Sequence, residues 1–533
     1  MHRRTFLLSG LGLAATAALS ACSKGSGGSG SAQAADKSSA FGFQATGLPI
    51  VTKQLPLTFS GSKSALAPKY ETMQLVQDWQ KDTNIAITWT NLPDEVYQQK
   101  KNLMLASGDL PDALFNTGLS DAETVQYGTN GTLIPLEDLI DEHAPILKGI
   151  FAKRPDIKSA MTASDGHIYT LPSVEELGIL QYPNFLYINR KWLDEAALPV
   201  PTTMAELKTA LQAFKKRGPN VIPLSFRTDS FCANAADLLL AVGGVPDNND
   251  HRIVQNDKVI FTAATDGWKA GVKELGEWYQ EGLIDPESFT QDDVAYLAKG
   301  KDNPENLGAF FWWELQEFVG DARMKDYVMV GILKGNDGVR RASLSNYQEI
   351  NRGAFAITRA NKYPEATMRW VDRLYDPVMS AETSWGPIGV ALKKDASGML
   401  VQIPAPAGVA QGEYRQKVAP GGPKITTAED FKTVVAPEPR AKVRQDLVKK
   451  YYAPYKANDQ YPPVMLSNDE LDQVNNPQTD IAALVKEKFA SWIVKGNIEA
   501  EWAGYLNSLK SIGVDDVTRV YQGAYDRYKK QQA

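Results

Sequence analysis

The sequence predicts an α/β fold of two lobes, in which each lobe holds a mainly parallel sheet flanked by helices. Strand and helix patterns alternate over residues 55–115 and again over 185–313, which is the order that βαβ units produce. The 533 residues exceed what a single hydrophobic core usually fills. From residue 479 onward the apolar spacing is helical almost to the end, so we expect a helical C-terminal region.

The first lobe begins with strands and helices that carry their own start and stop residues. Ile85, Ile87 and Trp89 alternate with more polar positions, which indicates a strand. Pro93 stands at the start of a helical pattern and Gly108 follows its end, as these residues favour. The sequence therefore predicts strands at 55–60, 84–90 and 112–115 and helices at 68–83 and 93–108.

The same alternation returns in the second half of the chain. Thr203 followed by Glu206 has the spacing of a capping box at the start of a helix. Gly282 stands at the end of another helical pattern, where glycine is favoured. The sequence predicts strands at 185–189, 222–226, 307–313 and 353–358 and helices at 203–218, 266–282 and 363–382.

The N-terminus carries an export signal. Arg3 and Arg4 precede an apolar stretch from Phe6 to Leu19, which is shorter than the roughly 20 residues of a membrane-spanning helix. It ends in LSAC, which resembles the lipobox of bacterial lipoproteins and makes Cys22 the expected lipidation site. The segment RRTFL also resembles a twin-arginine signal, so the export route stays open. We predict 1–22 as a signal peptide with lipobox, 23–50 as a flexible tether, 51–178 with 350–400 as lobe 1, and 179–349 with 401–533 as lobe 2.

Charge and motifs exclude several classes of function. The net charge is −6 and no basic block stands out, so nucleic acid is not an expected partner. The usual hydrolase, nucleotide-binding and zinc motifs are absent, and none of the four His residues has a partner at metal-binding spacing. We expect no enzymatic activity, no cofactor and no bound metal. A glycosidase needs only two suitably placed carboxylates, so a secreted glycoside-active enzyme stays open, as does a binding protein for a non-sugar solute such as a peptide.

Seven segments, in order along the chain, resemble extracellular solute-binding proteins for sugars. The segment ASGDLPDALFNTG has the small-G-D-x-P-D pattern of that family, and DGHIYTLPS resembles its strand leading to the hinge. Each segment alone is moderately specific, but their common order extends the resemblance over nearly the whole mature chain. The segments are 106–118, 131–145, 165–173, 186–215, 279–287, 360–376 and 520–530.

The chain resembles the long, oligosaccharide-binding lipoprotein branch of the maltose-binding-like superfamily, which includes alginate- and fructo-oligosaccharide-binding proteins. The resemblance implies a periplasmic-binding-protein-like fold with an oligosaccharide in the cleft between the lobes. It also implies delivery to the membrane-embedded permease of an ABC importer, from a lipid-anchored position on the extracellular face of the membrane, by a monomer. Long relatives often carry a calcium loop before the strand that matches 222–226, but here the residues read KKRGPNV, so calcium is not expected.

Candidate ligand-binding residues follow from the position of ligands in open parallel sheets. Ligands lie outside the carboxyl ends of the strands. Sugar rings need flat aromatic partners, and their hydroxyl groups need polar partners in a closed cleft. We predict ligand contacts from the aromatic residues Trp312, Trp313, Tyr347 and Trp385 and from the polar residues Asn116, Asp121, Arg227, Asp229, Glu314, Asn346 and Glu349.

The four consecutive aromatic residues from Phe310 to Trp313 need to be divided between core and cleft. Because side chains alternate along a strand, we expect Phe310 and Trp312 on one face and Phe311 and Trp313 on the other. We predict that both Phe side chains are core and that Trp313, ahead of Trp312, is a platform for a sugar ring. Trp385 lies in SWGPIG, a Gly/Pro loop that we expect to pack little against the core.

Overall fold

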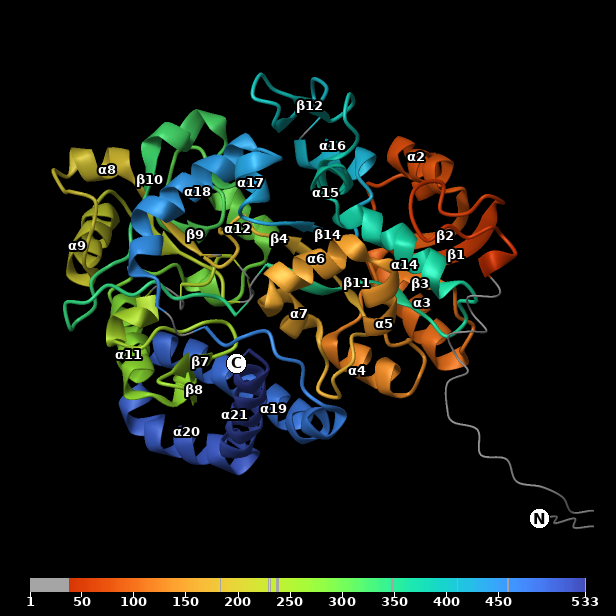
Figure 1. Ribbon diagram of the computed structural model, residues 1–533. Coiled ribbons are helices and arrows are strands. Elements are labelled where there is room, and N and C mark those ends of the chain that lie inside the picture. The colour runs from red at the N-terminus through yellow and green to blue at the C-terminus, as the bar shows by residue number, and fades with distance from the viewer. Residues whose placement is uncertain are drawn as a thin grey trace, which may run out of the picture.

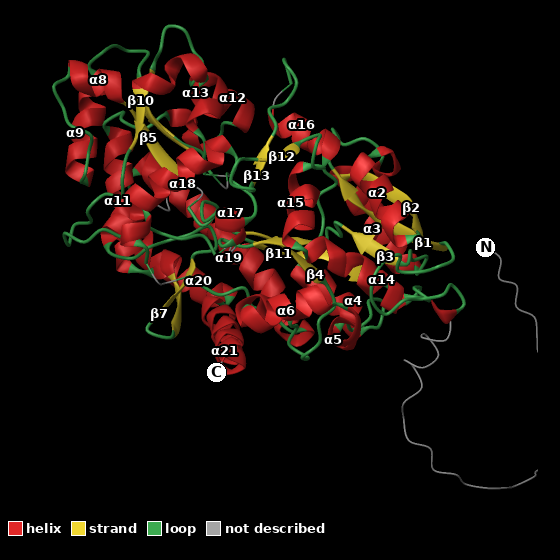
Figure 2. Cartoon of the chain, turned by 45° about the horizontal axis from the view of Figure 1, so that its top comes forward, coloured by secondary structure: helices red, strands yellow, loops and turns green. Residues whose placement is uncertain are grey.

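The computed structural model describes residues 38–532, apart from 183, 229, 231, 236–238, 347–348, 410 and 458–459. The predicted signal peptide, with Cys22, lies outside this part of the chain. A sheet of six strands and a sheet of four strands form the framework. Figures 1 and 2 show the two sheets side by side, each within its own lobe. The predicted two-lobed α/β fold is confirmed.

Lobe 1 is built on the six-stranded sheet, whose order is β14-β4-β11-β3-β1-β2. Within it, β1 is parallel to β2 and β3, β4 is parallel to β14, and β11 is antiparallel to both of its neighbours. The strands are β1 (Leu55–Lys63), β2 (Ile85–Pro93), β3 (Ala113–Phe115), β4 (Leu171–Glu175), β11 (Ile350–Ile357) and β14 (Lys424–Thr426). The helices are α2 (Gln74–Thr83), α3 (Asp94–Ser107), α4 (Asp121–Thr129), α5 (Glu137–His143), α6 (Pro145–Lys153), α7 (Pro155–Met161), α14 (Pro364–Asp372) and α15 (Pro377–Trp385).

Lobe 2 is built on the four-stranded sheet, whose order is β10-β5-β9-β6. Only β6 and β9 are parallel, because β5 runs antiparallel to both β9 and β10; in this detail the sheet differs from the mainly parallel one that we predicted. The strands are β5 (Phe185–Asn189), β6 (Ile222–Ser225), β9 (Leu307–Trp312) and β10 (Tyr327–Met329). The helices are α8 (Arg190–Glu195), α9 (Met204–Lys215), α11 (Asp266–Gln280), α12 (Asp293–Lys299), α13 (Leu315–Val319) and α18 (Pro439–Tyr451).

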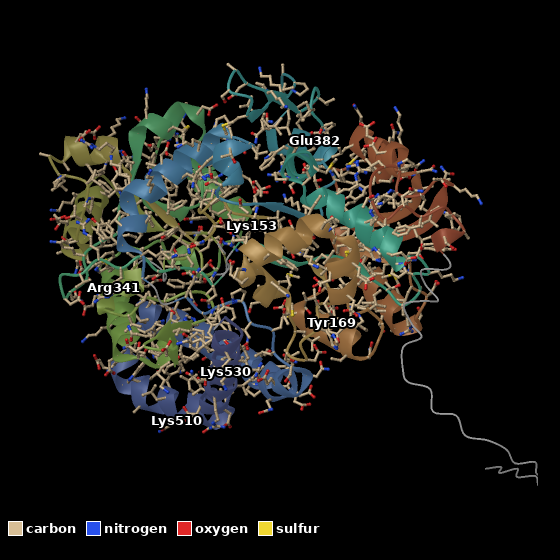
Figure 3. The ribbon with its side chains drawn as sticks, viewed as in Figure 1. Lys153, Tyr169, Arg341, Glu382, Lys510 and Lys530 are labelled. Carbon is tan, nitrogen blue, oxygen red and sulfur yellow. The ribbon has the colours of Figure 1, made fainter. Side chains whose placement is uncertain are left out.

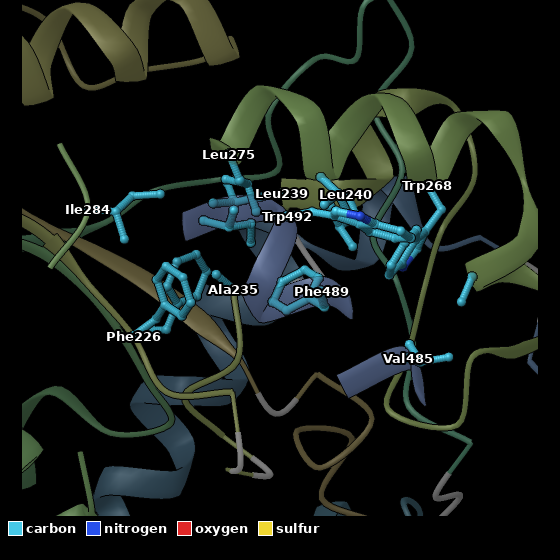
Figure 4. Packing of buried hydrophobic residues seen from close by; sticks show 14 of the residues in the cluster. Phe226, Ala235, Leu239, Leu240, Trp268, Leu275, Ile284, Val485, Phe489 and Trp492 are labelled. Atoms are coloured by element: carbon cyan, nitrogen blue, oxygen red, sulfur yellow. The ribbon is translucent and has the colours of Figure 1, made fainter. Parts of the chain in front are cut away.

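A large core joins lobe 2 to the C-terminal helices. Figure 4 shows Trp268 of α11 and Phe489 and Trp492 of α19 within one buried cluster. The indole of Trp268 donates to the buried carboxylate of Asp247 at 3.0 Å, which satisfies both polar groups. The predicted helical C-terminus is confirmed as α19 (Asn468–Lys495), α20 (Ile498–Ile512) and α21 (Val514–Gln532). Two hairpins lie outside the two main sheets: β7 (Arg252–Gln255) with β8 (Lys258–Phe261), and β12 (Leu392–Lys394) with β13 (Leu400–Gln402). The remaining short helices are α16 (Gln411–Val418) and α17 (Asp430–Thr433).

The helix predicted at 363–382 is divided in two. A 3-10 turn at Arg373–Tyr375 separates α14 from α15, and α15 begins at Pro377. Pro377 has no N–H group with which to continue the backbone hydrogen bonds of the preceding helix. The Asp376 carboxylate caps the new helix by accepting from the Val378 and Met379 N–H groups at 3.0 and 3.1 Å. The Asp-Pro pair therefore starts the helix that carries Glu382, labelled in Figure 3, and ends at Trp385.

The chain crosses between the lobes beside β4 and β11. The backbone carbonyl of Glu349 accepts from the Glu175 N–H at 3.3 Å, and the Glu349 carboxylate accepts from Gly178 and Leu180 N–H groups at 2.9 and 3.2 Å. Glu349 thus fastens the crossing segment after β4 to the one before β11. Burial raises the pKa of Glu349 to about 7.

Residues 424–426 depart from the predicted division of the chain. We placed 401–533 in lobe 2, whereas β14 pairs with β4 in the sheet of lobe 1. Without β14, the outer edge of β4 would have unpaired backbone N–H and C=O groups. Pairing with β14 supplies partners for these groups. The other predicted lobe boundaries stay a prediction. Among the described residues, no helix is both long and apolar enough to cross a membrane.

Candidate functional site

A cavity of about 700 Å³ lies between the two lobes. One wall consists of the residues after β9, helix α13 and the start of α18, all from lobe 2. The facing wall consists of the end of α15, strand β13 and helix α16, and Figure 1 shows α15 and α16 opposite α18. The residues that line the cavity are Trp313, Glu314, Gln316, Glu317, Gly320, Asp321, Trp385, Gln402, Gln411, Gly412, Arg415, Gln416, Glu438, Arg440 and Arg444.

The aromatic residues of β9 separate into core and cavity. Phe310 and Phe311 are fully buried in two different clusters, which confirms that both are core and face opposite sides. Trp312 is buried beside Phe310, and Trp313 packs against that same cluster while lining the cavity. Our prediction that Trp313 shares the face of Phe311 is wrong, because β9 ends at Trp312 and strand alternation no longer fixes the next side chain.

One carboxylate holds both tryptophans. The indole N–H groups of Trp312 and Trp313 donate to the same oxygen of Glu317, at 3.0 and 2.7 Å. Glu317 lies on α13, directly after the strand, so this short helix fixes the orientation of both rings.

Arg444 of α18 covers one face of Trp313. The guanidinium carbon lies 4.2 Å from the ring centroid, a cation–π contact. Arg440 donates to Glu314 at 3.0 Å, and Arg444 lies 3.8 Å from the other oxygen of the same carboxylate. Burial raises the pKa of Glu314 above its usual range, and the two arginines offset only part of that effect. A ligand ring can therefore stack only on the opposite face of Trp313.

Trp385 differs from our prediction, because it is packed. It is the last residue of α15, and the loop begins only at Gly386, whose φ of 104° favours glycine. The side chain is 6% exposed and packs in a small apolar cluster with Leu400 and Phe431. Arg415 lies over its ring at 5.2 Å. Trp385 therefore forms a wall of the cavity and also supports lobe 1.

Arg415 and a buried ion pair connect this wall to strand β4. Glu175, at the end of β4, accepts from Lys424 at 2.8 Å and from Arg415 at 3.3 Å. Burial disfavours ionised Glu175, but Lys424 and Arg415 outweigh burial and lower its pKa to about 2. Burial lowers the pKa of Lys424. Arg415 Nε also donates to the Ser384 carbonyl at 2.6 Å.

A smaller cavity of about 200 Å³ adjoins the first and contains Asn116. Asn116 follows β3 with a positive φ of 55°. Its amide donates to the Tyr70 hydroxyl at 3.3 Å and to the Pro420 carbonyl at 3.4 Å. Arg415 and Gln416 line both cavities, so this predicted residue lies next to the main site.

Asp121 and Asn346 lie in a different groove, of about 350 Å³. Asp121 is paired with Arg352. The amide of Asn346 donates to Asp250 at 2.8 Å and its oxygen accepts from the Tyr461 N–H at 3.0 Å. The structure therefore separates these two predicted residues from the cavity between Trp313 and Trp385.

Two further predicted residues, Arg227 and Glu349, lie outside both walls of the main cavity. Arg227 is paired with Asp293 and donates to the Gln291 carbonyl at 2.9 Å, within lobe 2. Glu349 is 2% exposed and holds the crossing segments together. Asp229 and Tyr347 lie outside the described residues.

Sequence reasoning missed the charged residues on the helices of the site. Arg415, Arg440, Arg444 and Glu317 come from α13, α16 and α18, whereas the search followed strand ends. Arg440 and Arg444 are four residues apart, so they share a helix face. That spacing alone does not show whether this helix face borders solvent or a cavity.

The family comparison agrees with this geometry. Residues 64–381 match the family of bacterial extracellular solute-binding proteins, which is more than half of the chain. The chain belongs to this family.

Other extracellular solute-binding proteins extend the similarity to nearly the whole chain. The fructooligosaccharide ABC transporter substrate-binding protein FusA of Streptococcus pneumoniae is 36% identical over 493 residues, covering 89% of this chain and 90% of FusA. The structure of FusA in complex with kestose has a TM-score of 0.79 at 35% identity and covers 89% of this chain and 99% of that one. An HMO-binding, ABC-transporter-associated solute-binding protein from Bifidobacterium longum infantis shares the fold, with a TM-score of 0.79 at 23% identity, covering 89% of this chain and 99% of that one. The alginate-binding protein AlgQ2 shares it with a TM-score of 0.67 at 24% identity, also covering 89% and 99%.

Within the described ranges, this member of the family has no cluster of three or more His, Cys, Asp or Glu side chains arranged to hold a metal ion. The residues before β6, where the resemblance suggested looking for a calcium loop, are Lys216, Arg217 and Gly218 followed by Pro219 and Asn220. These residues supply no carboxylate, and carboxylate oxygens are the main ligands of a calcium loop.

Proposed function

We propose that this protein captures an oligosaccharide in the cavity between Trp313 and Trp385 and delivers it to the permease of an ABC importer. The main support for this proposal is the cavity itself, whose walls come from both lobes and combine two tryptophans with charged side chains. A volume of about 700 Å³ lies within the usual range for small-molecule sites. A ligand that contacts both walls favours the closed arrangement of the lobes, because its contacts are complete only there.

The sugar that we propose is a fructooligosaccharide. FusA, which matches 89% of this chain, is a fructooligosaccharide ABC transporter substrate-binding protein. The charges of the cavity support an uncharged ligand, because Arg415, Arg440 and Arg444 each lie within 4 Å of a carboxylate. An acidic sugar would have to displace one of these carboxylates.

Calorimetry with kestose, nystose, alginate oligosaccharides and a peptide tests this function. We expect binding of the fructooligosaccharides alone, and a ligand at 100 times its Kd should add about 2.7 kcal/mol to the free energy of unfolding. Chromatography of the sugar after incubation should recover it intact. Release of shorter sugars would instead indicate a glycoside-active enzyme, and binding of the peptide alone would contradict the sugar proposal.

We also propose that the mature protein is a monomer held at the extracellular face of the membrane through lipid on Cys22. Support comes from the LSAC segment and the Ser/Gly-rich residues that follow it, and from the extracellular family. Cys22→Ser should move the protein from the membrane fraction to the medium. Retention in the membrane fraction would contradict lipid anchoring.

A further inference from the structure

Arg415 is the residue at which the main cavity, the smaller cavity and strand β4 meet. It lines both cavities. Its Nη2 lies 3.3 Å from the Glu175 carboxylate at the end of β4, and its Nε donates to the Ser384 carbonyl at the end of α15. Its guanidinium also lies over the ring of Trp385. These contacts fix the plane of the guanidinium group.

The third nitrogen of Arg415 is available. In the part of the chain that the structure describes, Nη1 makes no hydrogen bond or ion pair, and it is not among the buried atoms without a partner. The side chain is 37% exposed, and it lines both cavities. Guanidinium groups carry five donors in a rigid fork, so two nitrogens can hold the group in place while the third contacts a ligand.

We propose that Arg415 is a ligand-binding residue that donates from Nη1 to a sugar hydroxyl at the junction of the two cavities. This assignment rests on the proposed function, which it deepens. The same guanidinium touches Glu175 on β4, so the sugar makes an indirect contact with the strand beside which the chain crosses between lobes. Arg415 lines both cavities, so we expect a sugar that extends from the main cavity toward Asn116 to lie beside it.

The chain offers a matched control for removing this arginine. Arg217 also pairs with one carboxylate, that of Glu195 at 2.6 Å, and its guanidinium lies 4.5 Å from the centroid of the Trp192 ring. Its side chain is 34% exposed, close to the value for Arg415. Both of its partners belong to α8, which Figure 1 shows at the edge of lobe 2 away from α15 and α16. Arg217→Ala therefore removes comparable protein contacts without touching the proposed site.

Calorimetric titration of the mature chain with kestose and nystose provides the test. We expect at least tenfold weaker binding for Arg415→Ala and unchanged binding for Arg217→Ala. Arg415→Lys can restore the ion pair with Glu175 and hence the unfolding midpoint, but its ammonium is a compact point charge without the planar fork that holds Glu175 at one nitrogen and presents another to the sugar. We therefore expect the lysine variant to stay at least fivefold weaker.

The outcomes separate the two proposals. Wild-type affinity in Arg415→Ala, or full recovery of affinity in Arg415→Lys, would overturn the role of Nη1 while leaving the proposed function standing. If the wild-type chain binds neither sugar, the proposed function fails, and the assignment of Arg415 fails with it.

Discussion

The two tryptophans that line the cavity, Trp313 and Trp385, have different structural roles. Trp313 lies just past the end of a strand, is only half-buried, and is held by Glu317 at its edge and Arg444 on one face. Trp385 ends a helix, is almost fully buried, and packs among apolar side chains of lobe 1. The comparison teaches that an aromatic ring in a cavity wall is not by itself a platform; what covers its faces decides whether a ligand can use it.

The largest expected effect is on folding. Trp385→Ala should lower the free energy of unfolding by about 3 kcal/mol, because removing a buried indole leaves a cavity in the wall of lobe 1. Chemical denaturation of the variant measures this loss. A variant as stable as the wild type but unable to bind sugar would reverse the comparison and make Trp385 the platform.

Trp313→Ala should act on binding instead. Loss of the stacking surface should weaken kestose binding about tenfold, equivalent to about 1.4 kcal/mol, with a smaller change in stability than Trp385→Ala. Calorimetry gives the affinity, and Trp502→Ala, in the core shared by lobe 2 and the C-terminal helices, serves as a control whose affinity should not change. Equal losses of affinity in both variants would remove Trp313 from the site.

The carboxylates behind the two walls should respond to pH in opposite directions. The pKa of Glu175 is lowered to about 2, so its contribution to stability is present above the ordinary pKa of about 4.3 and is lost as the pH falls from there toward 2. The pKa of Glu314 is raised, so above the ordinary pKa the folded state binds more protons than the unfolded state, and stability falls as the pH rises from the ordinary pKa toward the raised one.

Unfolding free energies measured from pH 2.5 to 7 for Glu175→Gln and Glu314→Gln test these signs. One proton changes the slope by at most about 1.4 kcal/mol per pH unit. We expect Glu175→Gln to reduce the fall of the unfolding free energy at acid pH. We expect Glu314→Gln to make the unfolding free energy rise more steeply with pH. Slopes changed in the same direction would contradict the difference between the walls.

The smallest expected effect concerns the support of Trp313. Glu317→Leu removes the acceptor of both indole N–H groups, so the ring loses its fixed orientation, and kestose binding should weaken about threefold, or about 0.7 kcal/mol. Glu317→Gln keeps an acceptor oxygen of the same shape and should stay closer to the wild type. Both affinities come from the same titration, and identical losses in the two variants would mean that the charge matters rather than the acceptor.

Most of the framework could be predicted from local patterns. The strands at 185–189 and 307–313 and the helices at 93–108 and 266–282 are found within a residue or two, because alternation, Pro and Gly act locally. Trp313 was expected at the cleft because it stands at the end of the predicted strand 307–313, and it lines the cavity. Trp385 was misjudged because Gly386 marks the end of a helix and not the middle of a loop.

The charged half of the site could not be predicted, for a physical reason. Arg415 reaches the cavity because α16 and β14 both contact α15, and β14 has three residues, KIT, that pair with β4 far away in the sequence. No local pattern marks so short a strand. Asp121 and Asn346 also follow the strand-end rule, but their partners Arg352 and Asp250 place them in another groove.

The position of β11 has a consequence for how the chain matures. β11 is inserted between β3 and β4, so the sheet of lobe 1 stays in two unconnected parts until residues 350–357 have been made. Translation from the end of β4 to the start of β11 takes roughly 10 to 35 s at usual rates. Throughout that interval the facing edges of β3 and β4 stay open in the nascent chain, and open strand edges can pair with other chains.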